Sequence, residues 1–408
     1  MAKRLLEGVK VLDFTMALVG AFCSRILADM GADIIKVERP PGGDDVRYIQ
    51  PVAPELGGMF IFANSGKRSI GLDLKRREGV EIAKALVPEV DVVLENFRPQ
   101  VMRKFGMDYP NLKKLNPGMV MCSLSGYGQY GPWSDLTCTD PIAQAVGGLT
   151  YITGDPEGYP QAVGGGLGDT ITAVMGAMAV GYALFYRERT GVGQYIDVSM
   201  MESNLFIDGT VAPLVAATRG KQQPRRNAQH NTVTCPMGNF KASEGYIAIH
   251  GDWGSLCEVM GRRELIDDPR LATHDARLEN IQLLQEAVES WLQSFPSDDA
   301  AMEALREGQI WSGPVMSQWQ ILNHPQIQAR GIVREVEYPD GTTIPTIASP
   351  YQFSETPVQV GRVPFAGEHN QEILEEYLGY SEERVQSLVK EGVMFEGEQA
   401  RELKSGDR

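Results

Sequence analysis

Short apolar runs alternate with amphipathic segments over the first 200 residues, and this order constrains the fold more than any other feature. Runs rich in Val, Ile and Leu predict buried strands, and the segments between them predict helices. Because strand and helix alternate, the pattern is typical of a parallel sheet with crossover helices, and we predict an α/β fold with a Rossmann-like layer. The predicted strands are 9–14, 32–37, 69–74, 91–95, 119–124 and 194–199, and the predicted helices are 21–30, 78–86, 111–115 and about 169–189.

Beyond residue 200 the pattern predicts a second, smaller α+β domain and a return to the first. A strand is predicted at 246–250, a hairpin at 332–348 with its turn at 339–341, and two helices at 369–378 and 381–391. The predicted parts are the N-terminal part of the large domain (1–200), a linker (201–224), the small domain (225–330) and the C-terminal part of the large domain (331–408).

The charge of the chain is acidic but unevenly distributed. The net charge is −15, which disfavours a nucleic-acid partner because phosphate binding needs excess basic surface. Residues 1–115 nevertheless carry 18 Lys and Arg against 15 Asp and Glu. An anionic ligand is therefore more easily held by this first part, although a mildly charged face on an acidic protein explains the same count.

Cysteine, histidine and hydropathy patterns exclude several classes of protein. The five cysteines include no C-x-x-C pair and the five histidines no H-E-x-x-H pair, so neither a disulfide framework nor a metal site is predicted. The N-terminal segment lacks the apolar core of a signal peptide. The apolar run 171–186 is too short to span a bilayer and predicts a buried helix. We expect a cytoplasmic protein with no membrane partner.

Two glycine clusters could bear on function. Residues 126–131 spell G-x-G-x-x-G after a predicted strand, but no helix start follows, which favours a structural turn over dinucleotide binding. Residues 164–169 end on Asp169, which is expected to open the long apolar helix. The local pattern favours Asp169 as the N-cap of that helix. A carboxylate at a helix N-terminus is also stabilised in its ionised form, and a nucleophilic carboxylate must be ionised. Both roles of Asp169, N-cap and nucleophile, therefore stay open.

Together these segments resemble the family III CoA-transferases. The resemblance is close over 5–205, looser over 225–330, and recovers near 331–353 and 367–369. The matching segments are 6–15 (LEGVKVLDFT), 27–40 (LADMGADIIKVERP), 64–70 (NSGKRSI), 95–99 (ENFRP), 125–132 (SGYGQYGP), 140–145 (DPIAQA), 168–169 (GD) and 190–194 (TGVGQ).

The resemblance implies a large Rossmann-like domain built from both chain ends, a smaller domain between them, and an interlocked homodimer. It implies that Asp169 is the catalytic aspartate and that Asp140 supports it. No permanently bound cofactor is implied, since the CoA thioester is itself a substrate. The implied CoA-binding residues are Ala17, Leu18, Arg39, Leu72, Asp73, Leu74, Lys75, Asn96, Phe97, Arg98 and Lys104.

The implied reaction moves CoA from an acyl-CoA donor to a free carboxylic acid through an aspartyl mixed anhydride and an aspartyl-CoA thioester. Covalent storage on the protein keeps water from becoming the acceptor. Three alternatives stay open: a related α-methylacyl-CoA racemase, a CoA-binding subunit without catalysis in a heterodimer, and an NAD-dependent oxidoreductase. The racemase is disfavoured because Thr139 stands where that enzyme has a histidine base.

Overall fold

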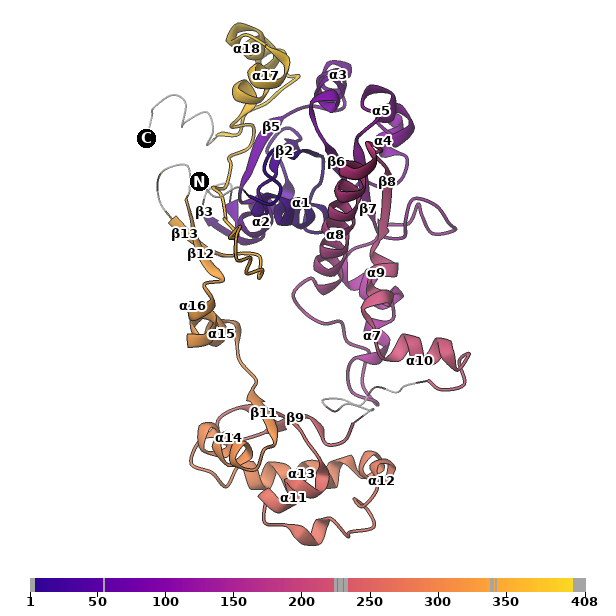
Figure 1. The fold of residues 1–408 in the computed structure, drawn as a ribbon, viewed down its shortest axis with the longest axis vertical. Coiled ribbons are helices and arrows are strands. Elements are labelled where there is room, and N and C mark those ends of the chain that lie inside the picture. Colours follow the sequence, from indigo (N-terminus) through magenta and orange to yellow (C-terminus); the bar gives the residue numbers. More distant parts are fainter. Residues whose placement is uncertain are drawn as a thin grey trace. The chain divides into compact units, whose positions relative to one another are not determined.

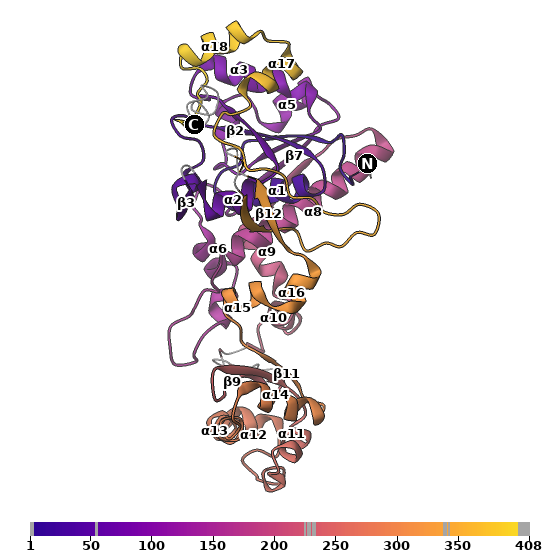
Figure 2. The same ribbon diagram turned by 90° about the vertical axis from the view of Figure 1, so that its left-hand side faces the viewer.

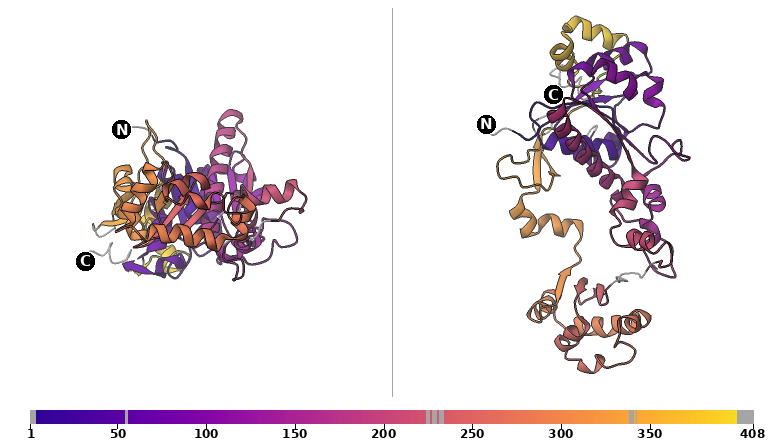
Figure 3. Two further views of the ribbon diagram at one scale, coloured as in Figure 1. Left: turned by 90° about the horizontal axis from the view of Figure 1, so that it is seen from below. Right: turned by 45° about the vertical axis from the view of Figure 1, so that its right-hand side comes forward.

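The structure is a computed structural model. It describes residues 4–53, 56–223, 226, 230, 234–337, 341 and 343–398. Contacts divide the chain into two compact units. The first contains Met1–Gly147, Gly164–Ile207 and Gln326–Arg408, and the second contains Gly148–Val163 and Asp208–Pro325. The C-terminal helices of the first unit lie beside strands from the beginning of the chain, as Figures 1 and 3 show.

A six-stranded sheet forms the centre of the first unit. Its order is β5-β2-β1-β6-β7-β8, and every neighbouring pair is parallel. This is the 3-2-1-4-5-6 order of a doubly wound sheet, in which the chain reverses direction across the sheet between β1 and β6. The strands are β1 (Lys10–Asp13), β2 (Asp33–Glu38), β5 (Lys67–Gly71), β6 (Val92–Glu95), β7 (Val120–Ser125) and β8 (Tyr195–Ser199).

The prediction of six parallel strands is confirmed, with one shift in position. β5 begins two residues before the predicted segment and ends at Gly71, so the predicted residues 72–74 form a loop at the end of the strand. The difference matters because these three residues are implied ligand contacts, and loops at strand ends are where α/β proteins bind ligands.

Helices cover both faces of this sheet, as Figure 2 shows. Successive strand residues point to opposite faces. Leu12 and Val93 pack with α3, α5, α17 and α18, whereas Val11 and Val92 pack with α1 and α8. The helices of the first unit are α1 (Val19–Asp29), α2 (Gly58–Asn64), α3 (Arg77–Leu86), α4 (Val101–Lys104), α5 (Tyr109–Leu115), α6 (Asp140–Val146), α8 (Leu167–Thr190), α9 (Met200–Ile207), α17 (Asn370–Leu378) and α18 (Glu382–Lys390).

The long helix α8 begins two residues earlier than predicted. Its N-cap is Gly166, which has the left-handed conformation (φ +69°), so the prediction that Asp169 caps this helix is wrong. The C-terminal end is at Gly191, whose N–H donates to the Arg187 carbonyl at 2.7 Å in the usual glycine stop. By length and composition alone α8 could cross a membrane, yet half of its apolar window is buried against neighbouring elements, as in a core helix.

The remaining elements of the first unit include the predicted C-terminal hairpin. Residues 339 and 340 of its predicted turn lie outside the described residues. The hairpin strands are β12 (Val333–Glu337) and β13 (Thr343–Ile347), and the other elements are β3 (Pro51–Ala53), β4 (Leu56–Gly57), α16 (Pro325–Arg330) and the 3₁₀ turns at Asp45–Tyr48 and Val87–Glu89.

The second unit is an α+β fold with its own core. An antiparallel sheet in the order β11-β10-β9 packs on helices through Phe240, Ile247, Leu256 and Val288. Its elements are α7 (Leu149–Ile152), α10 (Val211–Ala217), β9 (Met237–Lys241), β10 (Tyr246–His250), α11 (Trp253–Val259), a 3₁₀ turn (Arg263–Leu265), α12 (His274–Glu279), α13 (Ile281–Leu292), α14 (Asp298–Glu307), β11 (Trp311–Pro314) and α15 (Gln318–Asn323).

The segment 201–224, which we expected to be a linker, is largely helical. It contains most of α9 and all of α10. Its apolar residues, such as Leu205 and Phe206, are exposed on α9, and this obscured the helical periodicity on which the sequence argument relied. Part of the polar stretch that follows lies outside the described residues.

The glycine cluster 126–131 forms a turn at the end of β7. Gly128 and Gly131 have positive φ angles, and a Cβ at Gly126 would come within 2.2 Å of the Cys138 Cβ. The next helix is α6, which begins at Asp140 rather than at the third glycine. The segment therefore lacks the helix N-terminus that a dinucleotide pyrophosphate requires.

Candidate active site

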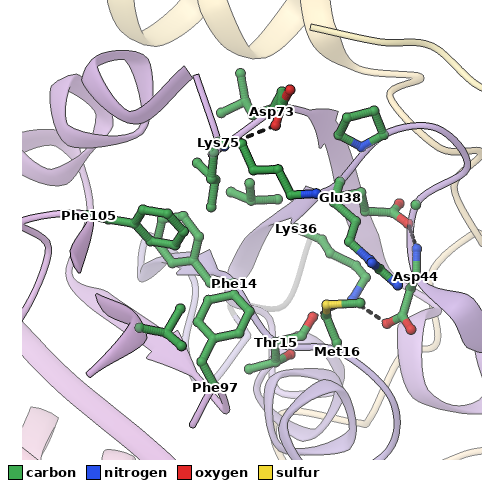
Figure 4. Close-up of a pocket in the computed structure, with 17 residues that line it drawn as sticks. Phe14, Thr15, Met16, Lys36, Glu38, Asp44, Asp73, Lys75, Phe97 and Phe105 are labelled. Atoms are coloured by element: carbon green, nitrogen blue, oxygen red, sulfur yellow. Dashed lines mark hydrogen bonds and ion pairs between the residues drawn. The ribbon is translucent and has the colours of Figure 1, made fainter. Parts of the chain in front are cut away.

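A cavity lies at the carboxyl ends of four parallel strands, where doubly wound sheets bind ligands. It is formed by the residues that end or follow β1, β2, β5 and β6, and Figure 4 shows its lining. The lining residues are Phe14, Thr15, Met16, Lys36, Val37, Glu38, Arg39, Pro40, Gly43, Asp44, Leu72, Asp73, Leu74, Lys75, Phe97, Val101 and Phe105.

The wall of this cavity combines apolar and cationic groups. Phe14, Phe97 and Phe105 give it three aromatic side chains on one side (Figure 4). Arg39 and Lys75 bring guanidinium and ammonium groups to it. The Arg39 side chain is half exposed and pairs with Asp45 at 2.5 Å. Such a wall suits a ligand with both apolar and anionic parts.

Buried ion pairs support the floor of the cavity. The Lys36 ammonium group bonds the Asp44 carboxylate at 3.0 Å and the Thr15 carbonyl oxygen at 2.8 Å, and it is completely buried. Glu38 accepts from the Arg47 guanidinium at 2.5 Å, and this pairing holds the pKa of Glu38 at about 2 despite the opposing effect of burial. These charges are satisfied within the protein, so they fix the shape of the floor.

The loop after β1, residues 15–18, forms one edge of the cavity. Asn96 brackets it: its side-chain oxygen accepts from the Met16 N–H at 2.8 Å, and its amide donates to the Met16 carbonyl at 2.7 Å. Ala17 has φ +59°, a conformation that costs energy for a residue with a Cβ. Its N–H donates to Asp44 at 3.2 Å. The loop is thus held in a strained conformation by side chains from β6 and the loop after β2.

The same loop reaches the N-terminus of α8. A Cβ built on Gly166 would lie 3.0 Å from the Leu18 side chain, so the glycine turn packs directly on this residue. Asp169 is at the third position of α8 and is partly buried. The cavity and the Asp169 carboxylate therefore flank one short loop within the first unit.

Asp140 caps α8 in place of Asp169. Its Oδ1 atom accepts the backbone N–H of Gly168 at 2.7 Å and that of Asp169 at 3.2 Å. No described residue donates a hydrogen bond to the Asp169 carboxylate. Burial, and then the nearby charge of Asp140, raise the pKa of Asp169 to about 6. Within the described part of the chain, Asp169 is consequently a carboxyl group without a hydrogen-bond donor at a positively polarised helix end.

The predicted ligand contacts fall into three groups. Arg39, Phe97 and the segment 72–75 line the cavity. Ala17, Leu18 and Asn96 form or hold the loop between the cavity and Asp169. Arg98 and Lys104 line neither of these: Arg98 is exposed beside a separate concavity, and Lys104 is exposed at the end of α4. As contacts to a ligand, all of these residues stay predictions.

Two neighbours of Asp140 and Asp169 were not predicted from the sequence. Gln144 is fully buried one turn beyond Asp140 on α6, and its Nε2 donates to Asp140 Oδ2 at 2.9 Å. Cys138 lies close enough that Asp169 and Asp140 add to the rise that burial causes in its thiol pKa. The four-residue spacing between Asp140 and Gln144 could have indicated the contact with Gln144, because residues i and i+4 share a helix face.

Comparison with known proteins shows the family of this chain. The family model described as CoA-transferase family III matches residues 6–370. The chain belongs to this family. As a family III CoA-transferase it is an enzyme that transfers CoA, and CoA thioesters are the substrates that the family suggests.

Several relatives match nearly the whole length of this family III CoA-transferase. It is 37% identical to the succinyl-CoA:mesaconate CoA-transferase of Haloarcula hispanica, with 94% of this chain and 99% of the relative covered. It is 34% identical to the succinate–glutarate CoA-transferase of Agrobacterium fabrum, over 91% and 95% of the two chains. The crystal structure of a CAIB/BAIF family protein from Brucella suis is 32% identical, with a TM-score of 0.83, and the match covers 92% of this chain and all of that one.

No metal centre accompanies the site of this CoA-transferase in the part of the chain that the structure describes. Within that part, no three His, Cys, Asp or Glu side chains are grouped closely enough to hold a metal ion. Asp169 and Asp140 form only a pair, and Asp140 already accepts three hydrogen bonds.

Proposed function

We propose that the enzyme moves CoA from an acyl-CoA donor to a free carboxylic acid, with Asp169 carrying the transferred group. One observation carries this assignment: Asp140 caps the helix, and among the described residues none donates a hydrogen bond to the Asp169 carboxylate. A pKa of about 6 keeps most of this group ionised at pH 7 and makes it more basic than an ordinary aspartate. Both properties suit a nucleophile.

Each step of the proposed reaction exchanges one bond for another. An Asp169 oxygen attacks the thioester carbonyl of the donor, the C–S bond breaks, and a mixed anhydride and CoA thiolate form. The thiolate then attacks the aspartyl carbonyl, which gives an aspartyl-CoA thioester and releases the first acid. The acceptor acid takes CoA by the same steps in reverse, and Asp169 is restored as the carboxylate.

The cavity beside the loop 15–18 is proposed to hold the CoA portion of both substrates. Arg39 and Lys75 supply the positive charge that phosphates require, and the aromatic wall suits the apolar parts of the ligand. Because the loop separates this cavity from Asp169 by only a few residues, a thioester bound there could extend to the carboxylate. The relatives named above suggest small dicarboxylic acids as the acceptors.

We also propose that the enzyme is an interlocked homodimer in the cytoplasm. Tyr182 and Phe185 on α8 and Phe206 on α9 are more than 60% exposed, and apolar exposure of this size is typical of an interface. Light scattering should give a dimer, and replacement of Tyr182 and Phe185 by Glu should weaken it. All five cysteines are unpaired, as in proteins of reducing compartments.

Mass spectrometry during turnover tests the role of Asp169. With acceptor acid labelled with ¹⁸O in its carboxylate, label should enter Asp169, and hydroxylamine should convert Asp169 to a hydroxamate. Asp169→Asn should lose transfer and labelling and keep its fold. Continued transfer by Asp169→Asn would defeat the assignment. Exchange of the substrate α-proton with deuterated water would instead indicate the racemase.

A further inference from the structure

The cap on α8 is itself held by a second side chain. Asp140 uses Oδ1 for the two backbone N–H groups of α8, and Oδ2 accepts from Gln144 Nε2 at 2.9 Å. Asp140 opens α6, and Gln144 follows four residues later on the same face of that helix. Both oxygens of the carboxylate are therefore fixed, one by α8 and the other by α6.

Gln144 is suited to orienting a charge without cancelling it. Its side chain is fully buried, so its amide has little freedom to turn away from Asp140. A Lys or Arg in the same place would neutralise the Asp140 carboxylate. A neutral amide donates a hydrogen bond and leaves the negative charge to act on Asp169.

We propose that Gln144 is a positioning residue for acyl transfer, which holds the Asp140 carboxylate over the N-terminus of α8 and so keeps the Asp169 carboxylate free for the substrate. This inference rests on the proposed function of Asp169. Gln144 acts through Asp140 and does not touch the reacting atoms.

The alternative partner for the α8 N-terminus is Asp169 itself. An acidic side chain at the third helical position can reach back to unpaired N–H groups in the first turn. If Asp140 turned away, Asp169 would become the cap, and these hydrogen bonds would stabilise its anion. Asp169 would then be a weaker nucleophile, with a lower pKa.

Gln144→Met tests the proposal, because Met has a similar volume and no donor. We expect kcat to fall about 10- to 100-fold, as when a hydrogen bond to a charged group is lost. The KM for acyl-CoA should stay within about twofold, because the CoA cavity is untouched. The acid limb of kcat/KM, near pH 6 in the parent enzyme, should move to lower pH.

Asp140→Asn separates orientation from charge. An amide oxygen can still cap α8, and a flip of the Gln144 amide in place lets its oxygen accept from the new amide, so the cap survives while the charge is lost. The acid limb should again move to lower pH, but kcat should fall less than in Gln144→Met. An equal or larger fall in Asp140→Asn would show that charge, not orientation, decides the rate, and would overturn the proposal.

Gln144→Glu provides the test if the Met variant does not fold. A protonated carboxyl group at this position can donate to Asp140, whereas the ionised form repels it. Transfer should therefore persist near pH 6 and decline as the pH rises, unlike in the parent enzyme. A flat profile at high pH would overturn the proposal.

The outcomes distinguish this inference from the proposed function. If Asp169→Asn is inactive and folded Gln144→Met has the parent kcat and acid limb, only the role of Gln144 fails. A loss of kcat in Gln144→Met without movement of the acid limb would reduce Gln144 to a structural residue. If Asp169→Asn transfers CoA, the proposed function fails first.

Discussion

Asn96 brackets the backbone of Met16, accepting from its N–H at 2.8 Å and donating to its carbonyl at 2.7 Å. This pair of hydrogen bonds joins β6 to the loop after β1, across the point where the strand order reverses. The loop borders the cavity on one side and the start of α8 on the other. The Asn96 side chain thus helps to hold the loop that lies between the proposed CoA cavity and the start of α8.

Asn96→Ala should raise the KM for acyl-CoA while it lowers the stability of the fold only modestly. Loss of two hydrogen bonds should lower the free energy of unfolding by about 1–3 kcal/mol, and release of the loop should raise the KM for acyl-CoA about tenfold. Steady-state kinetics and thermal melts measure the two effects. Asn116→Ala is the matched control, since Asn116 also makes two side-chain hydrogen bonds to the backbone, donating to the carbonyls of Val87 and Val90, but lies away from the cavity. Equal KM changes in the two variants would contradict this prediction.

Asp169→Asn should raise the melting temperature at pH 8. Because the pKa of Asp169 in the folded protein, about 6, lies above its unfolded value, the folded state binds this proton more tightly. Ionisation of Asp169 therefore lowers the free energy of unfolding as the pH rises from about 4 to 6. The neutral amide of Asn does not ionise, and the variant should be more stable by about 1–2 kcal/mol after allowance for partial exposure. Melting curves at pH 8 and pH 4.5 should show a gain at both values that is about three times larger at pH 8. A gain that does not depend on pH would refute the linkage.

Gly168→Ala should reduce kcat through Asp140. A Cβ at Gly168 would lie 3.0 Å from Asp140 Oδ1 and 3.1 Å from the Asn204 side-chain amide, so the carboxylate or the amide has to shift by a few tenths of an ångström, which disturbs the cap. We expect a fall in kcat of about tenfold. Gly164→Ala is the control, because its Cβ would meet nothing within 4 Å. Similar rates for the two alanine variants would show that the contact does not matter.

Two acidic residues near the cavity should differ sharply in their effect on stability. Glu38→Ala removes the carboxylate that balances the charge of the buried Arg47 guanidinium and should cost about 3–5 kcal/mol. Asp45→Ala breaks the exposed pair with Arg39 and should cost less than about 1 kcal/mol. The pKa of Glu38, about 2, also predicts that its stabilising contribution is lost as the pH falls below about 4. Chemical denaturation of both variants at pH 7 measures the difference.

Parallel strands were the part of the fold that local pattern predicts well. Strands such as β2 and β7 are rich in apolar residues, and this pattern predicts their burial. The charged Lys36 and Glu38 of β2 are buried through ion pairs with Asp44 and Arg47, which local pattern does not predict. Helix ends were predicted where glycine takes a left-handed conformation, as at Gly31 and Gly191. The helices of 201–224 were missed because their exposed apolar residues mask the pattern.

The sequence by itself determined that this chain forms a parallel α/β sheet, that an aspartate follows a run of glycines near the start of a long apolar helix, and that both resemble a CoA-transferase. Only the tertiary structure decided that Asp140, 29 residues before Asp169, caps that helix, so that no residue in the described ranges donates to the Asp169 carboxylate. The physical reason is that two backbone N–H groups at a helix end donate to whichever oxygen the fold brings within hydrogen-bond distance, here 2.7 and 3.2 Å. The sequence around the start of the helix contains the carboxylate of Asp169, but it does not contain that of Asp140.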